Sequence, residues 1–341
     1  MDFSYREFND SFLEKIATVS GQAELQEAGR QYVKTELQES AFSRAIIPQE
    51  QITTAECQRN TNDNSLYVIR DIEPDASAVG VDNLGEPDGS YVKGERYIIP
   101  IVNFTTKRFQ ITVEDLRAYQ YKITKRIEEK SVPVLEKLED KFFMKLSGAA
   151  IGASAATDTK AVKYAGGTAN LIIETSDVVK LKNTLTGGVP TVAVDSKKKE
   201  VGCILIAQES FEYAVMLPGA GDDFGKDRVQ DGLTSDTLFG TKFVKTIKTD
   251  IVPQGVLFAY STPDFLGHNF ALGDPNFEIK SNFGLIEWQT KESIGVGIGN
   301  ALSVAVLTLK GATDPAGNAI TVATDGTYIA ALADFYANLV I

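Results

Sequence analysis

Histidine and cysteine are almost absent from this chain of 341 residues: His268 is the only histidine, and Cys57 and Cys203 are the only cysteines. One histidine excludes a two-histidine metal site and leaves a single candidate base for a Ser-His-Asp or Cys-His arrangement. That candidate lies between glycine and apolar residues in the stretch FLGHNFALGD. The two cysteines are far apart, form no metal or redox motif and fit a reducing compartment. We interpret the cysteines as two ordinary thiols and His268 as structural or solvent-exposed.

The chain also lacks long apolar runs and an excess of basic residues. No run reaches the length of about 18 apolar residues that predicts a membrane-spanning helix. The first residues, MDFSYREFND, are polar and acidic, so no secretory signal is expected. The net charge of −12 argues against a surface that grips nucleic acid or anionic membranes. Hydrophobic residues make up 43% of the chain, which supports a real core in one large domain or two.

Motifs for catalysis or cofactor binding fail on inspection. The stretch GAGDDFGKD lacks the Gly-Lys-Ser/Thr end of a phosphate loop, and its acidic residues would repel phosphate. The alternating glycines of GVGIG (295–299) are predicted to lie inside a strand and do not open a helix, so we reject a dinucleotide site. The Asp/Asn runs near 82–89 and 314–325 lack the ligand order of a calcium loop. We therefore expect neither an enzyme nor a cofactor.

Residues 112–146 predict one long amphipathic helix. Thr112 and Asp115 form a helix start. An apolar stripe follows at spacings of three and four, with Lys, Arg and Glu on the opposite face; its members are Leu116, Tyr119, Ile123, Ile127, Leu135, Leu138, Phe142 and Leu146. Pro133 cannot donate to the preceding turn, so we expect a bend there. We expect Gly148 to end the helix and 149–175 to form a loop at a domain boundary.

Two strand candidates precede this helix, at 65–72 and 96–111. Pro100 lies inside the second, which indicates an edge strand. Because the residues between them are rich in Gly, Pro and Asp, the segment predicts a two-stranded ribbon with a mobile tip. Such a ribbon is marginal in water and needs a partner surface. A hairpin folded onto its own domain remains the alternative.

The other segments give a mixed pattern of helices and strands. Residues 1–55 predict amphipathic helices that Gly21 and Gly29 interrupt and Pro48 ends, and they lack apolar bulk of their own. Residues 176–260 predict an α/β unit around the buried strand VGCILIA (201–207). The run IGVGIGNALSVAVLTLK (294–310) predicts one long central strand on which the long helix lies.

Four stretches in this order carry a family resemblance: ELQESAFSRAIIP (36–48), VGCILIAQESFEYAVML (201–217), LFGTKFVKTIKTDIVPQGVLFAY (238–260) and SIGVGIGNALSVAVLTL (293–309). Together they resemble the major capsid protein of tailed bacteriophages, the Hong Kong 97-type fold. The resemblance covers about residues 30–310. It implies an α+β fold divided as follows: N-terminal arm 1–55, extended β-hairpin loop 56–110, peripheral domain with a spine helix 111–174, axial domain 175–262, and a return to the peripheral domain with a C-terminal tail 263–341.

The resemblance also implies how copies of the chain meet. The extended loop would lie across a neighbouring subunit, and the arm would reach another, since neither segment can bury itself. We expect the loop contacts at Tyr67, Ile69, Tyr91, Lys93, Tyr97 and Ile99. One branch of the family cross-links subunits through Lys and Asn, and Lys93 lies in the loop tip, but no partner Asn is evident and we expect no cross-link.

The function implied is self-assembly, as hexamers and pentamers, into an icosahedral shell that encloses double-stranded DNA without reading its sequence. The chain would be part of a virion assembled in the host cytoplasm, with a portal protein as partner and no membrane contact. Scaffolding and decoration proteins are further candidate partners, and the short arm leads us to expect any scaffold as a separate protein. The alternatives are an encapsulin-type nanocompartment, a soluble α/β hydrolase, and a phage tail or adhesion protein.

Overall fold

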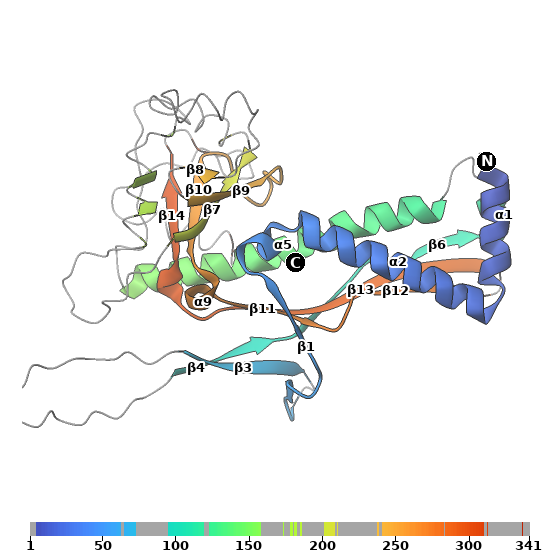
Figure 1. Cartoon of the computed structure of the whole chain (residues 1–341), viewed down its shortest axis with the longest axis horizontal. Coiled ribbons are helices and arrows are strands. Elements are labelled where there is room, and N and C mark those ends of the chain that lie inside the picture. The colour runs from blue at the N-terminus through green and yellow to red at the C-terminus, as the bar shows by residue number, and fades with distance from the viewer. Residues whose placement is uncertain are drawn as a thin grey trace, which may run out of the picture.

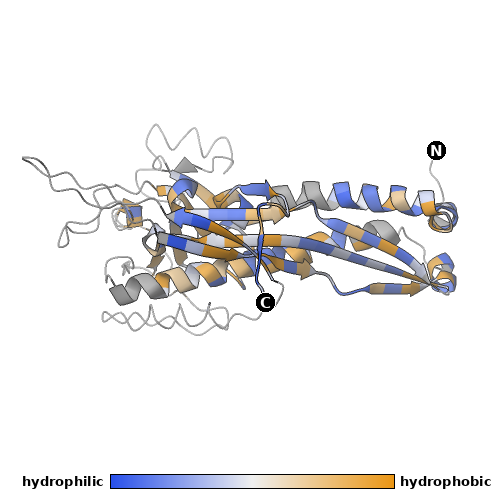
Figure 2. Ribbon diagram, turned by 90° about the horizontal axis from the view of Figure 1, so that it is seen from below, coloured by the Kyte–Doolittle hydropathy of each residue, from blue (hydrophilic) through white to orange (hydrophobic). Residues whose placement is uncertain are grey.

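The computed structural model of the chain describes residues 5–62, 65–72, 95–118, 123–157, 201–208, 241–282 and 284–309, together with residues 173, 178–179, 181–182, 185, 210, 237–238, 312 and 336. The molecule is elongated (Figure 1). Two long helices lie along one sheet, and a second sheet stands at one end of it. A β-ribbon extends at the same end, below the long sheet in the view of Figure 1. Apolar and polar residues alternate along the strands of the long sheet, as expected for a sheet with one covered face (Figure 2).

Three helices begin the chain: α1 (Tyr5–Ile16), α2 (Val19–Ser40) and α3 (Phe42–Ile46). Thr18 caps α2 by accepting a hydrogen bond from the Gly21 amide. The prediction that Gly21 and Gly29 interrupt the helix is wrong, because both lie within α2. A side chain at either position would clash with a neighbour. A Cβ on Gly29 would lie 2.4 Å from the Phe277 ring, and one on Gly21 would lie 2.2 Å from the Lys15 carbonyl oxygen.

The N-terminal segment packs on its own chain. Phe12 and Ile16 are buried in the main core, where Phe12 stacks with Trp288 at 6.4 Å between ring centroids. The expectation that this segment cannot bury itself is therefore wrong for α1. Helix α2 lies along the outer strand of the sheet, where Gln26 Nε2 donates to the Ile279 carbonyl at 3.0 Å.

The predicted long helix is present as α4 (Val113–Ala118) and α5 (Ile123–Thr157), and residues 119–122, with Tyr119, lie outside the description. The predicted cap is confirmed: the Asp115 amide donates to Thr112 Oγ1 at 3.0 Å. Helix α5 continues past Gly148, so the predicted end and the predicted loop from 149 are wrong as far as Thr157. Gly148 gives room for Tyr336, whose Cβ would lie 2.3 Å from a Cβ at position 148.

Pro133 lies within α5, which is helical on both sides of it. Two residues earlier, Ser131 Oγ donates to the Ile127 carbonyl at 2.8 Å, a bond that often accompanies local bending of a helix. The bend at Pro133 stays a prediction.

The solvent face predicted for this helix is only partly correct. Leu116, Ile127 and Leu135 are buried as expected, but Glu136, Glu139 and Asp140 are buried as well. Their cationic partners come from segments remote in the sequence, which helical periodicity cannot reveal.

The long sheet has the strand order β1 (Gln49–Ile52), β11 (Gly267–Leu272), β13 (Leu285–Ile298) and β12 (Asn276–Asn282). Strands β5 (Val102–Thr105) and β6 (Phe109–Thr112) also pair with β13. Alternate residues of β13, from Ile286 to Val296, are buried against the helices.

The second sheet has the order β14 (Val304–Thr308), β10 (Val256–Ser261), β7 (Val201–Ala207), β9 (Thr241–Thr246) and β8 (Thr237–Leu238). The buried strand predicted at 201–207 is confirmed as β7. A short helix, α9 (Pro263–Leu266), connects β10 to β11. The single strand predicted over 294–310 is wrong: the chain leaves β13 at Gly299, forms the 3₁₀ turn η1 (Ala301–Ser303) and enters the other sheet as β14. Helix α5 packs against β13, η1 and β14, so the predicted contact between the long helix and residues 294–310 is confirmed.

Candidate functional site

The β-ribbon is the first candidate site. It consists of β3 (Leu66–Ile72) and β4 (Glu95–Pro100), paired antiparallel from Tyr67 opposite Pro100 to Ile72 opposite Glu95, with β2 (Gln58–Arg59) beside β3. The predicted strand 96–111 is therefore divided into β4, β5 and β6. Pro100 does lie in an edge strand, as expected, since β4 is the outer strand of this three-stranded sheet.

One face of the ribbon, which we call the inner face, is buried on its own chain. Val68 and Ile99 are 1% and 0% exposed and pack with Ile52 and Phe270. The Arg70 guanidinium lies 4.8 Å from the centre of the Phe270 ring. This packing anchors the ribbon to β1 and β11.

The rest of the inner face lies on three alternating glycines, Gly295 and Gly297 of β13 and Gly299 directly after it, which we call the glycine track. A Cβ on Gly297 would lie 2.5 Å from Ile99 Cγ1, and one on Gly299 would lie 2.8 Å from Tyr97 Cζ. A Cβ on Gly295 would likewise lie 2.6 Å from Ile101 Cδ1. The stretch GVGIG lies in a strand, as predicted, as far as Ile298, and the structure shows that its glycines make room for β4.

The opposite, outer face of the ribbon is apolar and accessible. Ile98 is 64% exposed, and the half-buried Tyr67 and Ile69 lie on the same face because the register pairs Ile69 with Ile98. The same face also carries a charged pair, because Asp71 and Arg96 follow Ile69 and Ile98 in the register, and Arg96 Nε donates to Asp71 Oδ1 at 2.7 Å in an exposed ion pair. The exposed Ile98, with Tyr67 and Ile69 on the same face, makes this face a candidate contact surface for another protein chain.

The predicted contact residues divide between the two faces. Tyr67 and Ile69 are on the outer face, and their contact with a neighbour stays a prediction. Tyr97 and Ile99 are on the inner face, and Ile99 is fully buried, so this residue offers no free surface. Tyr91 and Lys93 lie outside the described residues. Ile98 was missed: alternation along β4 places it on the face opposite Ile99, but only the contact with β13 decides which of the two faces is accessible.

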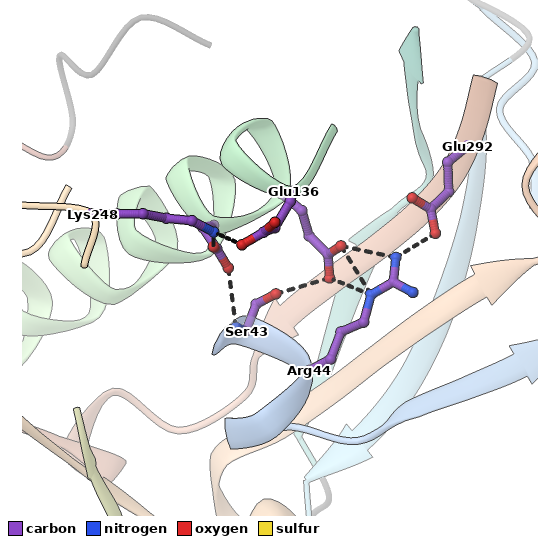
Figure 3. A network of polar contacts seen from close by, with 7 residues as sticks. Ser43, Arg44, Glu136, Lys248 and Glu292 are labelled. Carbon is purple, nitrogen blue, oxygen red and sulfur yellow. Dashed lines mark hydrogen bonds and ion pairs between the residues drawn. The ribbon is translucent and has the colours of Figure 1, made fainter. Parts of the chain in front are cut away.

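A buried charge cluster is the second candidate site (Figure 3). Arg44 of α3 contacts Glu139 Oε2 at 2.9 Å and Glu292 Oε1 at 2.5 Å. Lys248, in the β9–β10 connection, makes short ion pairs with Glu136 and Asp140 of α5. Ser43 joins the two groups, because its amide donates to Asp140 and its hydroxyl donates to Glu139.

Burial controls the protonation of this cluster. Burial raises the pKa of Asp140 to about 7, against the opposing effect of Lys248. It also raises the pKa of Glu292, although Arg44 acts in the opposite direction. For Arg44, burial lowers the pKa, but Glu139 and Glu292 outweigh it and the pKa is raised, so Arg44 remains a cation.

No catalytic arrangement is evident among the residues that the structure describes. Burial raises the pKa of the Cys203 thiol to about 12, which keeps it protonated and unreactive. His268 stacks on Phe270 at 5.4 Å between ring centroids, a structural position. Within the described ranges no group of three or more His, Cys, Asp or Glu side chains could hold a metal ion, and no helix there is long and apolar enough to cross a membrane.

The architecture as a whole defines a class. A spine helix on a long sheet, an upright second sheet and an extended ribbon form the Hong Kong 97-type fold of phage capsid subunits. Three solved structures show it at 10–11% sequence identity, which is a likeness of fold alone. Comparisons with family models and with curated proteins give no match.

All three structures come from phages, and the first two are phage capsids. The capsid asymmetric unit of cyanophage Pam1 matches with a TM-score of 0.53, covering 76% of this chain and 88% of the other. The mature capsid of bacteriophage PhiM1 matches with a TM-score of 0.52, covering 79% and 87%. A structure from Microbacterium phage Oxtober96 matches with a TM-score of 0.51, covering 79% and 91%.

Proposed function

We propose that this chain is a major capsid protein, whose copies associate as hexamers and pentamers into an icosahedral shell around the double-stranded DNA of a bacteriophage. The observation that carries the proposal is the ribbon. Its inner face is buried on the subunit's own sheet, while its outer face presents Ile98 with Tyr67 and Ile69. The fold shared with phage capsid structures supports a second copy of the chain as the partner.

The energetics favour such a contact. Full burial of one large aliphatic side chain stabilises an interface by about 1.5–3 kcal/mol. Ile98 is 64% exposed in the isolated subunit and can supply much of that amount. Because the glycine track and the Phe270 contacts hold the ribbon base in place, less ordering entropy is lost when a neighbour binds.

The charge supports the container role. A net charge of −12 disfavours tight binding of the chain to DNA phosphates. We propose a structural role without catalysis, in a virion assembled in the host cytoplasm. A portal protein would be a partner, and scaffolding and decoration proteins are further candidates.

The experiment is electron microscopy and sedimentation of the purified chain and of Ile98→Asp. The parent should form rings or closed shells, and Ile98→Asp should sediment as small species with the parent's far-ultraviolet circular dichroism. Val19→Asp, which places the same charge on an 86% exposed apolar residue of α2, is the matched control and should still assemble.

Two outcomes contradict the proposal: a parent that stays monomeric across salt and pH, or normal shells from Ile98→Asp. The contents of particles formed in cells separate the main alternative. Double-stranded DNA supports the phage capsid, whereas a packaged enzyme favours the nanocompartment.

A further inference from the structure

The buried charge cluster contains more acids than bases. Four carboxyl groups (Glu136, Glu139, Asp140 and Glu292) face two cations, so full ionisation would leave a formal charge of 2 − 4 = −2. Water screens this excess poorly at three of the four acids, because the side chains of Glu139 and Asp140 are 0% exposed and that of Glu292 is 2% exposed. Solvent reaches the cluster mainly at its Lys248 end, where Lys248 is 18% and Glu136 9% exposed. A buried excess of negative charge is relieved by binding a proton.

The cluster also joins four elements of the fold. Helix α5 contributes Glu136, Glu139 and Asp140, and strand β13 contributes Glu292. Helix α3 contributes Arg44 and Ser43, and the β9–β10 connection contributes Lys248 (Figure 3). A change of charge here therefore acts on the joint between the N-terminal segment, the spine helix and the second sheet.

We propose that the buried charge cluster is a proton-operated clasp: a proton held among its carboxyl groups keeps α3 and the β9–β10 connection against α5, and loss of that proton loosens the joint. The clasp is a property of the subunit and does not depend on the shell proposed above. Asp140 is the central group, because it contacts both movable parts, through the Ser43 amide at 3.1 Å and through Lys248.

The direction of the effect follows from linkage. The closed joint raises the pKa of Asp140 from its ordinary 3.8 to about 7, so the closed state binds protons more tightly than an open, hydrated one. The stabilisation is complete below the ordinary pKa and is lost as the pH rises through about 7. From this relation, opening should become about tenfold easier between about pH 6 and about pH 8.5.

The test is hydrogen–deuterium exchange of the full chain at these two pH values, corrected for the intrinsic pH dependence of exchange. Sedimentation verifies the same assembly state at both. Peptides covering 42–47 and 247–252 should lose about tenfold in protection at the higher pH. Asp140→Asn should abolish most of this loss, and Glu292→Gln, which removes the other carboxyl group whose pKa burial raises, should reduce it. Asp250→Asn is the matched control: it removes an exposed carboxylate that pairs with Lys137 of α5 across the same two elements.

Infrared spectroscopy of the parent tests the proton itself, so the proposal remains testable if a variant fails to fold. A carbonyl band from a protonated, buried carboxyl group should be present at the lower pH and should disappear at the higher one. The proposal is overturned if that band is absent at the lower pH. It is also overturned if protection does not change with pH, or if both neutral variants keep the parent's pH dependence.

Discussion

Gly297 and Ile99 are in direct contact across two different sheets: a Cβ at position 297 would lie 2.5 Å from Ile99 Cγ1. Strand β4 forms its ladder with β3, and β13 forms its ladders with other strands. The ribbon is therefore held to the long sheet by side chains resting on glycine backbone, and a methyl group at one position suffices to disturb it.

Gly297→Ala should lower the free energy of unfolding by about 1–3 kcal/mol, because the added methyl overpacks Ile99. Ile99→Ala alone should cost about 2–5 kcal/mol through the cavity it leaves. The double variant should cost less than the sum by more than about 0.5 kcal/mol, since the methyl then fills part of that cavity. Urea unfolding measures all three, and Gln289→Ala, on the half-buried face of the same strand, serves as an additive control.

Arg44→Ala should destabilise the subunit by about 3–5 kcal/mol, because Glu139 and Glu292 would lose their shared cation inside the core. Arg96→Ala removes the exposed partner of Asp71 and should cost about 1 kcal/mol or less. Equal losses in the two variants, measured by denaturant unfolding, would contradict the importance of the buried pairing.

The Arg44→Ala loss should also depend on pH. Arg44 lowers the pKa of Glu292, so its removal raises that pKa further above the ordinary value. The variant then keeps more of its stability at low pH and loses it as the pH rises through the raised pKa. Unfolding measured near pH 5 and near pH 8 should show the larger loss at the higher pH, and the opposite order would refute this account.

Gly148→Ala should destabilise the subunit although alanine is the better helix former by about 1 kcal/mol. The added methyl would lie 2.3 Å from Tyr336 Cβ, and Tyr336 is fully buried, with its hydroxyl bonded to the Ile251 carbonyl. Ala149→Gly, at the adjacent exposed position, measures the propensity effect alone. A higher melting temperature for Gly148→Ala would contradict this account and show that Tyr336 can shift away from the added methyl at little energetic cost.

Pro133→Ala should stabilise the isolated subunit, by up to about 3 kcal/mol, because it restores a hydrogen-bond donor inside α5. If the helix must bend at this position during assembly, the variant should build fewer or misshapen shells despite its greater stability. Thermal unfolding and microscopy of the same samples separate the two effects. The adjacent exposed Val134→Ala should change stability by about 0.5 kcal/mol or less.

Deletion of residues 74–92 should leave a folded subunit that does not assemble stably. Ile72 and Glu95 are paired across the ribbon, so the remaining Glu73, Lys93 and Gly94 can close it as a three-residue hairpin loop. The far-ultraviolet circular dichroism should match that of the parent, and sedimentation should show small species. Normal particles of normal stability would mean that the loop tip does not clamp subunits together.

Local patterns were sufficient to predict some elements and insufficient for others. The spacing of Leu116, Ile127 and Leu135 predicted the spine helix, and the apolar run of β7 predicted a buried strand. Both signals are local periodicities or runs of residues. Gly148 was taken for a helix end because a glycine next to a helix pattern usually is one. Its real role depends on Tyr336, which is remote in the sequence.

The candidate sites show the same limit. The sequence of 65–110 predicted a ribbon that needs a partner surface. It could not tell whether Ile98 or Ile99 is exposed, because that depends on which face of the ribbon packs on β13. Glu139 was expected in solvent because nothing local indicates Arg44 as its partner. The position of a charged residue inside a core is decided by tertiary pairing, which single-sequence periodicity does not report.

Helix α2 has a consequence for how copies of the chain avoid the wrong contacts. Strand β12 is the outer strand of the long sheet, and the exposed edge of such a strand can pair with any similar strand and seed aggregation. The Gln26 side chain donates a hydrogen bond to the Ile279 carbonyl of β12, and the missing side chain of Gly29 lets α2 pack closely against Phe277. By covering this part of β12, helix α2 disfavours unspecific strand pairing between copies of the chain, so that contacts between copies are left to side chains, which discriminate between partners.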